Sequence, residues 1–350
     1  MKPGPPTLPT AVVSPVCGRD VTIVTKVADI RMVPGVRSGP VGRILRVGRI
    51  LCVANQKGGV GKTTTASNLA AALAHGGMRT LLVDLDPQCN ATTGFGVAPA
   101  AMHPLVLETP LADSIVATSL PNLFVLPGSR SVRDVERIAA RSRAGSAMLE
   151  QHLGLGLAAW DYCLIDCPPS IGDLTRTALA GSTEVLMPIQ CEYFALEGLT
   201  QMIEVIRDVM QERPGRLSFS GIVLTMHDAA LELTAEVEAE VRDFFGEIVF
   251  QTVIPRDVAV SEAPSHAQSV LDYAPRSRGA RAYTELCMEV RDCEQGTTPR
   301  TRTRSIARTG RARHAGTGDP GHVGPRPAAG PARDGRWPRL GRRQAHAPRA

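Results

Sequence analysis

The stretch Arg49-Ile-Leu-Cys-Val-Ala-Asn-Gln-Lys-Gly-Gly-Val-Gly-Lys-Thr-Thr-Thr65 decides the fold. An apolar, strand-like run over 50–54 leads into a glycine-rich turn, and a helical pattern begins directly after it, at Lys62. Three glycines let the backbone turn tightly, so that successive N–H groups can point into one concavity. The amino end of the following helix adds positive potential to that concavity. The order strand, glycine turn, helix is typical of a phosphate-binding P-loop.

The side chains of this loop predict a nucleoside triphosphate site. Lys62 can reach the β- and γ-phosphates, and the Thr63 hydroxyl can hold Mg²⁺. Position 56 is Gln where the general P-loop has Gly, and a second lysine, Lys57, precedes the glycines. The spacing alone shows only that Lys57 is surplus to the one phosphate-binding lysine. The site residues predicted in this segment are Lys57, Gly58, Gly59, Val60, Gly61, Lys62, Thr63 and Thr64.

The amino-acid composition indicates which class of protein this is. The chain has 350 residues, of which 43% are hydrophobic, as in ordinary globular proteins. It shows no apolar run of membrane-spanning length and no signal-peptide pattern, so we expect a cytoplasmic protein without a membrane partner. The spacing Cys163-x3-Cys167 fits neither a CxxC pair nor half of a zinc site. We therefore expect the cysteines to be reduced thiols.

Charge and composition divide the chain into three parts. Residues 1–48 are rich in Pro, Gly, Val and Arg and carry a net charge of +5, and residues 297–350 contain thirteen Arg and two Asp. We expect a disordered basic extension over 1–48, an acidic folded domain over 49–293 and a disordered Arg-rich tail over 294–350. Two interpretations of the extensions remain open: a polyelectrolyte arm that grips phosphates, or solvated or mis-assigned sequence from a high-GC genome.

The folded part alternates strands and helices, which predicts a P-loop α/β fold with a mostly parallel twisted sheet covered by helices on both faces. The expected strands span 50–54, 79–86, 122–127, 162–166, 184–189 and 219–226, with a short one ending near 254. The expected helices span 62–75, 195–211, 234–245 and 277–293, with further helices between 128 and 156.

Carboxylates follow two of the expected strands. Asp84 and Asp86 close one apolar strand, and Asp166 closes another. The ligand crevice of a parallel sheet lies at the carboxyl ends of its strands, so these acids should reach the loop. We expect Asp86 to orient the water that attacks the γ-phosphate, and Asp166 to stand on the metal side. Thr63, Asp86 and Asp166 are the expected metal-site residues.

The loop with its second lysine resembles the deviant Walker A ATPases, the class of ParA, MinD and the nitrogenase iron protein. The segments Val83–Thr92, Leu164–Ser170, Pro188–Gly198 and Val253–Pro264 further resemble ParA, in the same order and over about residues 49–291. The resemblance implies ATP as nucleotide, Mg²⁺, and slow hydrolysis in a nucleotide-sandwich homodimer. It also implies a ParB-like centromere-binding partner and transport of plasmids or chromosome origins along nonspecific DNA, with association with the nucleoid. By position, Lys57 resembles the lysine that reaches across the dimer, and Pro255 with Arg256 resembles the region beside the adenine.

Three residues depart from the ParA pattern. Cys89 stands where family members usually have Gly, so we expect a stiffer switch segment. Ala230 and Ala259 stand where basic residues are usual. Both losses remove phosphate contacts from an acidic core, so we expect the folded part to bind DNA weakly, if at all.

Two other functions stay open at this point. One is a MinD-like ATPase that positions another cargo or a division site, although no amphipathic membrane helix follows the last expected helix. The other is a nucleotide-gated binding module with negligible turnover. The cysteine blocks of the iron protein are absent from the sequence.

Overall fold

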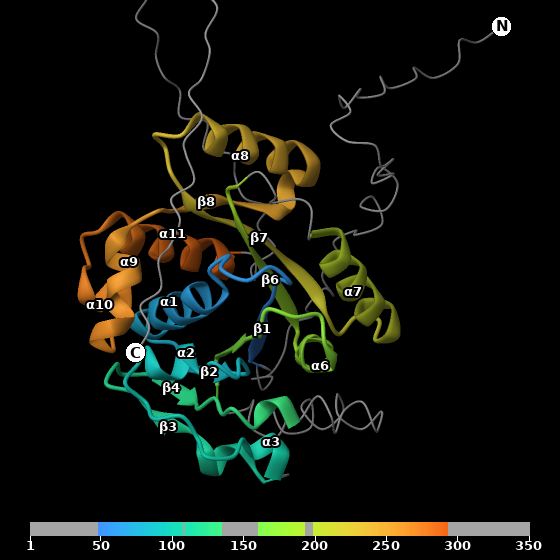
Figure 1. Cartoon of the computed structure of the whole chain (residues 1–350), viewed down its shortest axis with the longest axis vertical. Coiled ribbons are helices and arrows are strands. Elements are labelled where there is room, and N and C mark those ends of the chain that lie inside the picture. Colours follow the sequence, from blue (N-terminus) through green and yellow to red (C-terminus); the bar gives the residue numbers. More distant parts are fainter. Residues whose placement is uncertain (1–47, 108, 135–159, 193–198, 293–350) are drawn as a thin grey trace, which may run out of the picture. The chain divides into compact units, whose positions relative to one another are not determined.

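The computed structural model describes residues 48–107, 109–134, 160–192 and 199–292. These residues form one eight-stranded sheet whose strand order is β3-β4-β2-β5-β1-β6-β7-β8 (Figure 1). All neighbouring strands pair in parallel except β3 and β4, which are antiparallel. The strands are β1 (Arg49–Val53), β2 (Thr80–Asp84), β3 (Val116–Ala117), β4 (Leu123–Leu126), β5 (Tyr162–Asp166), β6 (Glu184–Gln190), β7 (Ser218–His227) and β8 (Val249–Pro255).

Helices cover both faces of the sheet, as the sequence predicts (Figure 1). The longer helices are α1 (Lys62–His75), α6 (Asp173–Ala180), α7 (Leu199–Glu212), α8 (Glu232–Phe245) and α11 (Arg278–Asp292). Short helices are α2 (Asn90–Thr93), α3 (Pro104–Leu107), α9 (Val258–Glu262) and α10 (Val270–Tyr273), with 3₁₀ turns η1 (Leu111–Ser114), η3 (Gly246–Ile248) and η4 (Ala263–His266). None of the described helices has the length and apolar character needed to span a membrane.

The alternation of side chains along β1 explains the two layers of core. Ile50 and Cys52 face one apolar cluster, which includes residues of α6, α7 and α8. Leu51 and Val53 face the other, which includes residues of α1, α10 and α11. Successive strand residues point to opposite faces, so a strand that is apolar throughout is buried on both sides.

Several helix and strand boundaries differ from those predicted from the sequence. The strand predicted to reach Asp86 ends at Asp84, because the Asp86 N–H turns back to donate to the Asp84 carboxylate and Pro87 has no N–H to continue a ladder. The sequence does not predict the helix α6 or the short elements β3, α2, α3, α9 and α10. The helices expected between 128 and 156, the start of the helix expected from 195, and both terminal extensions lie largely or wholly outside the described residues.

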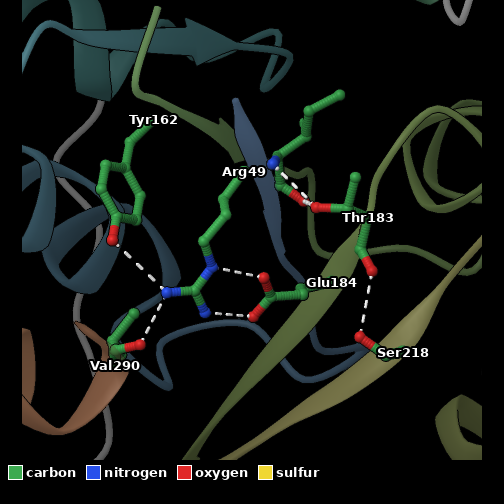
Figure 2. A network of polar contacts seen from close by, with 7 residues as sticks. Arg49, Tyr162, Thr183, Glu184, Ser218 and Val290 are labelled. Carbon is green, nitrogen blue, oxygen red and sulfur yellow. Dashed lines mark hydrogen bonds and ion pairs between the residues drawn. The ribbon is translucent and has the colours of Figure 1, made fainter. Parts of the chain in front are cut away.

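A largely buried arginine connects several elements at the amino ends of the central strands (Figure 2). The Arg49 guanidinium at the start of β1 donates to both carboxylate oxygens of Glu184 at the start of β6. It also donates to the Val290 carbonyl of α11 at 2.7 Å and lies 3.4 Å from the Tyr162 hydroxyl of β5. Burial by itself lowers the pKa of Arg49, but Glu184 outweighs it, so the pKa is raised and the group stays charged. The network therefore fixes β1, β5, β6 and α11 against one another.

Candidate nucleotide-binding site

The glycine loop follows β1 and leads directly into α1. Gly59 and Gly61 have φ angles of 76° and 86°, a region that residues with a Cβ adopt only at a cost. The helix begins at Lys62, and the Thr65 N–H donates to the Gly61 carbonyl at 2.8 Å. The earlier N–H groups of the first turn have no intrahelical partner, which is the arrangement that binds phosphate.

Neighbouring strands hold this loop in place. The Asn55 side-chain amide donates to the Pro188 carbonyl of β6 at 2.7 Å, and the Asn55 side-chain oxygen accepts from the Lys57 N–H at 3.1 Å. The Thr225 hydroxyl of β7, the strand next to β6, donates to the Val60 carbonyl at 2.9 Å. Contacts with β6 and β7 thus hold the loop at the carboxyl ends of the parallel strands, where the sequence predicts the ligand.

The two lysines of the loop have different surroundings. The Lys62 ammonium is buried and donates to the Lys57 carbonyl at 2.9 Å. Burial is the main effect and lowers the pKa of Lys62, while Asp166, Cys167 and Asp86 act against it. The Lys57 ammonium points elsewhere: it lies 3.9 Å from the Glu192 carboxylate, and about a third of its side chain, 35%, is exposed.

Three carboxylates lie near one another, and two of them, Asp86 and Asp166, act on Lys62. Asp84 and Asp166 are paired in register at the ends of β2 and β5, and Asp86 follows two residues after Asp84. Asp86 is buried, and its carboxylate accepts from the Gln88 N–H at 2.9 Å. The structure therefore brings together the acids that the sequence nominates.

The surroundings of Asp166 suit a bound cation. It is fully buried, and neither of its carboxylate oxygens has a hydrogen-bond partner within the resolved set of residues. Burial raises the pKa of Asp166 well above its usual range, and Asp84 adds to this, while the nearby Thr63 hydroxyl, which makes no well-formed hydrogen bond to the carboxylate, and Lys62 lower it. A buried carboxylate of this kind needs a cation to stay ionised.

The donor set fits Mg²⁺ rather than an all-protein metal site. Over the described ranges, no group of three His, Cys, Asp or Glu side chains could enclose a metal ion. Mg²⁺ is usually held by one or two carboxylates or hydroxyls together with substrate phosphates and water. The orphaned oxygens of Asp166 beside Thr63 match that pattern.

Asp84 makes contacts that the sequence does not predict. Its carboxylate accepts from the Asp86 N–H at 3.1 Å and from both the N–H and the hydroxyl of Thr92, at 2.8 and 2.6 Å. Burial above all raises the pKa of Asp84 to about 6. The Asp-x-Asp spacing marks both acids as candidates for contacts near the site. It does not reveal that Asp84, and not Asp86, accepts hydrogen bonds from Thr92 of α2.

Cys89 is held in the left-handed region, with φ 59°, just before α2. Its thiol is buried, and burial, followed by Asp84 and Asp86, raises its pKa. A residue with a Cβ pays a cost in this region, where glycine would pay none, and the stiffer switch segment stays a prediction. Cys52, Cys163, Cys167, Cys191 and Cys287 are likewise free thiols, as predicted.

The remaining predicted residues lie on the β7–β8 side. Pro255 pairs with His227 in the ladder, and the Arg256 N–H donates to the His227 carbonyl at 2.8 Å. Pro255 and Arg256 thus lie beside the carboxyl end of β7, the strand whose Thr225 donates to the Val60 carbonyl. Ala230 is exposed and Ala259 half-buried, on the same side.

Comparison with known proteins adds independent support. Residues 48–219 match the family described as "AAA domain". The chain is 44% identical over 249 residues to the sporulation initiation inhibitor protein Soj of Bacillus subtilis, covering 70% of this chain and 98% of that protein. It is also 44% identical over 249 residues to the chromosome partitioning protein ParA of Caulobacter vibrioides, covering 69% of this chain and 93% of that protein. The chain belongs to the Soj/ParA family of chromosome-partitioning ATPases.

Solved structures confirm the fold of this Soj/ParA chain. Cobyrinic acid a,c-diamide synthase from Mycobacterium smegmatis, with a bound ATP analogue and magnesium, superposes with a TM-score of 0.63 at 32% identity, covering 72% of this chain and 98% of that one. The cell division ATPase MinD of Pyrococcus furiosus gives a TM-score of 0.59 at 27% identity, covering 70% and 99%. The predicted P-loop α/β class and the deviant Walker A resemblance are confirmed.

Proposed function

We propose that this Soj/ParA ATPase is a dimerising switch for chromosome or plasmid partition, driven by ATP and Mg²⁺ and reset by slow hydrolysis. The observation that carries the proposal is the pair of lysines in one loop. Lys62 is buried against the loop backbone, which supports its role as the phosphate-binding lysine. The Lys57 ammonium lies beside Glu192, and the Lys57 side chain is partly exposed. A second lysine in that position is available to a nucleotide on another subunit.

Each site residue has a distinct part in the proposed hydrolysis. The N–H groups of 58–64 hold the phosphates, and Lys62 neutralises charge on the β- and γ-phosphates. Asp86 orients the attacking water, and the Lys57 side chain of the partner subunit stabilises charge that develops on the transferring phosphoryl group. Pro255 and Arg256 border the adenine.

Thr63 would hold Mg²⁺ directly, with Asp86 and Asp166 on the metal side. Bound there, Mg²⁺ would neutralise charge on the nucleotide phosphates. The protein's own contribution is a buried carboxylate, Asp166, that is left without another partner inside the described ranges.

We infer that the partner that stimulates turnover is a ParB-like centromere-binding protein, because the relatives that span most of this chain are named chromosome partitioning proteins. Binding of the folded domain to nonspecific DNA is expected to be weak, because Ala230 and Ala259 offer no positive charge. We place the protein in the cytoplasm, and its association with the nucleoid then depends on the Arg-rich tail.

Analytical ultracentrifugation of the full chain tests the switch. Asp86→Ala should slow hydrolysis and sediment as a dimer with ATP and Mg²⁺, and as a monomer with ADP. Lys62→Ala, which loses the phosphate contact, should stay monomeric in both nucleotides and serves as the matched control. A monomeric Asp86→Ala protein in saturating ATP and Mg²⁺ would contradict the proposal.

A further inference from the structure

Three segments that are distant in sequence meet at the carboxyl end of β2. Asp84 ends this strand, Thr92 lies in α2, and Gly128 follows β4. The Thr92 hydroxyl donates to the Asp84 carboxylate at 2.6 Å and accepts from the Gly128 N–H at 2.8 Å. One hydroxyl therefore joins α2 to two strands of the sheet.

The Asp84 carboxylate packs closely against the backbone of Gly128. A Cβ on Gly128 would lie 2.8 Å from the Asp84 carboxyl carbon, closer than side chains tolerate. Asp84 and Thr92 are both fully buried. Glycine at 128 is thus required by the close approach of this carboxylate, and the junction is packed as a unit.

The same carboxylate also reaches the hydrolytic segment. One Asp84 oxygen accepts from the Asp86 N–H at 3.1 Å, while the other accepts from the N–H and hydroxyl of Thr92. The backbone of Asp86 is therefore fixed by a group whose own orientation is set by Thr92. A shift of this carboxylate would move Asp86 without altering the P-loop, which is held separately by Asn55 and Thr225.

We propose that Thr92 is a positioning residue for ATP hydrolysis: through Asp84 it holds the backbone of Asp86 at the distance and angle that the attacking water requires. The inference rests on the role of Asp86 proposed above. Misplacing a catalytic group by about 1 Å can cost about a hundredfold in rate, so a hydrogen bond that fixes its backbone has a large effect on turnover. Nucleotide affinity depends on the P-loop instead and should not change.

The test compares four variants of the full chain by steady-state phosphate release. Thr92→Val keeps the shape but removes the hydroxyl, and Thr92→Ser restores it. Thr177→Val is the matched control. Thr177 is buried in α6, and its hydroxyl donates to the backbone carbonyl of Asp173 in the same helix, at 2.7 Å. Asp86→Ala reports on the proposed role of Asp86.

We expect Thr92→Val to lower kcat about tenfold or more while KM for ATP stays within about twofold of wild type. Thr92→Ser should recover most of kcat, and Thr177→Val should leave kcat unchanged even where its thermal stability falls as far as that of Thr92→Val. An inactive Asp86→Ala beside a fully active Thr92→Val would overturn this inference alone. Equal losses in Thr92→Val and Thr92→Ser, or a rise in KM that accounts for the loss, would overturn it as well. Normal turnover by Asp86→Ala would remove the role of Asp86, and the inference with it.

Discussion

Replacing Arg49 by Met should destabilise the protein strongly without weakening ATP binding. The guanidinium is largely buried: 14% of the Arg49 side chain and 16% of the Glu184 side chain are exposed (Figure 2). Arg49→Met leaves the Glu184 carboxylate buried and unpaired and the Val290 carbonyl without its donor. Removing one partner of a buried ion pair typically costs about 3–5 kcal/mol.

Urea unfolding measures this loss as a shift of the midpoint at constant slope. Arg49→Met should lower the free energy of unfolding by about 3–5 kcal/mol. The double variant Arg49→Met/Glu184→Met leaves no buried charge, so its loss should be smaller than the sum of the two single losses by about 1–3 kcal/mol. KM for ATP should stay within about twofold of wild type, because the network lies at the end of β1 opposite the P-loop.

Two outcomes would refute this reasoning. If Arg49→Met lowers the free energy of unfolding by less than about 1 kcal/mol, the pair contributes no more than an exposed salt bridge. If the loss of unfolding free energy in the double variant equals the sum of the two single losses, Arg49 and Glu184 contribute independently, and the ion pair in Figure 2 has no coupling energy.

Two further predictions concern Cys89 and His103. Cys89→Gly should keep the free energy of unfolding within about 1 kcal/mol of wild type, because relief of the left-handed strain offsets the lost burial and the added backbone entropy. Cys89→Ala keeps the strain, so it should be less stable than Cys89→Gly and release phosphate more slowly. If Cys89→Ala turns over as fast as Cys89→Gly, strain at this position does not limit the switch. Burial lowers the pKa of the His103 imidazole to about 4. Below pH 6.5 the unfolded chain then binds a proton at His103 that the folded protein does not, so His103 by itself lowers stability by about 2 kcal/mol between pH 7 and pH 5. The raised pKa of Asp84 acts in the opposite direction over the same range, so the test is the difference between wild type and a variant. His103→Asn retains an acceptor for the Leu105 N–H, which the ring accepts at 3.2 Å, and in urea titrations its stability relative to wild type should rise as the pH drops from 7 to 5. An unchanged difference between the two proteins over that range would exclude an effect of His103.

Local patterns predicted the parts of the site that lie within one continuous segment. Three glycines and a lysine at fixed spacing specify the P-loop, and the helix beginning at Lys62 matches the predicted bounds. Buried parallel strands such as Tyr162–Asp166 are continuous apolar runs, so their ends, and the acids placed there, follow from the sequence. The family resemblance added the relation to ParA, which the comparisons confirm.

Contacts between distant segments were not predictable. The Thr92 hydroxyl meets Gly128 across 36 residues, and no local pattern specifies that contact. Likewise, Asp86 falls outside its predicted strand because a side chain, Asp84, captures its N–H in place of the ladder. The two-residue strand β3 is exposed at the sheet edge and too short to show a period.

Lys57 is proposed to act on the nucleotide of a second subunit, and a mixing experiment tests this directly. Lys57→Ala and Asp86→Ala should each be almost inactive alone. In a mixed dimer, the Lys57→Ala subunit keeps its own Asp86 and receives Lys57 from its partner, so one complete site forms. Phosphate release from an equal mixture should recover to about a quarter of the wild-type rate, because about half of the dimers are mixed and each has one complete site of two. Activity no greater than the sum of the separate variants, at every ratio and concentration, would contradict the account.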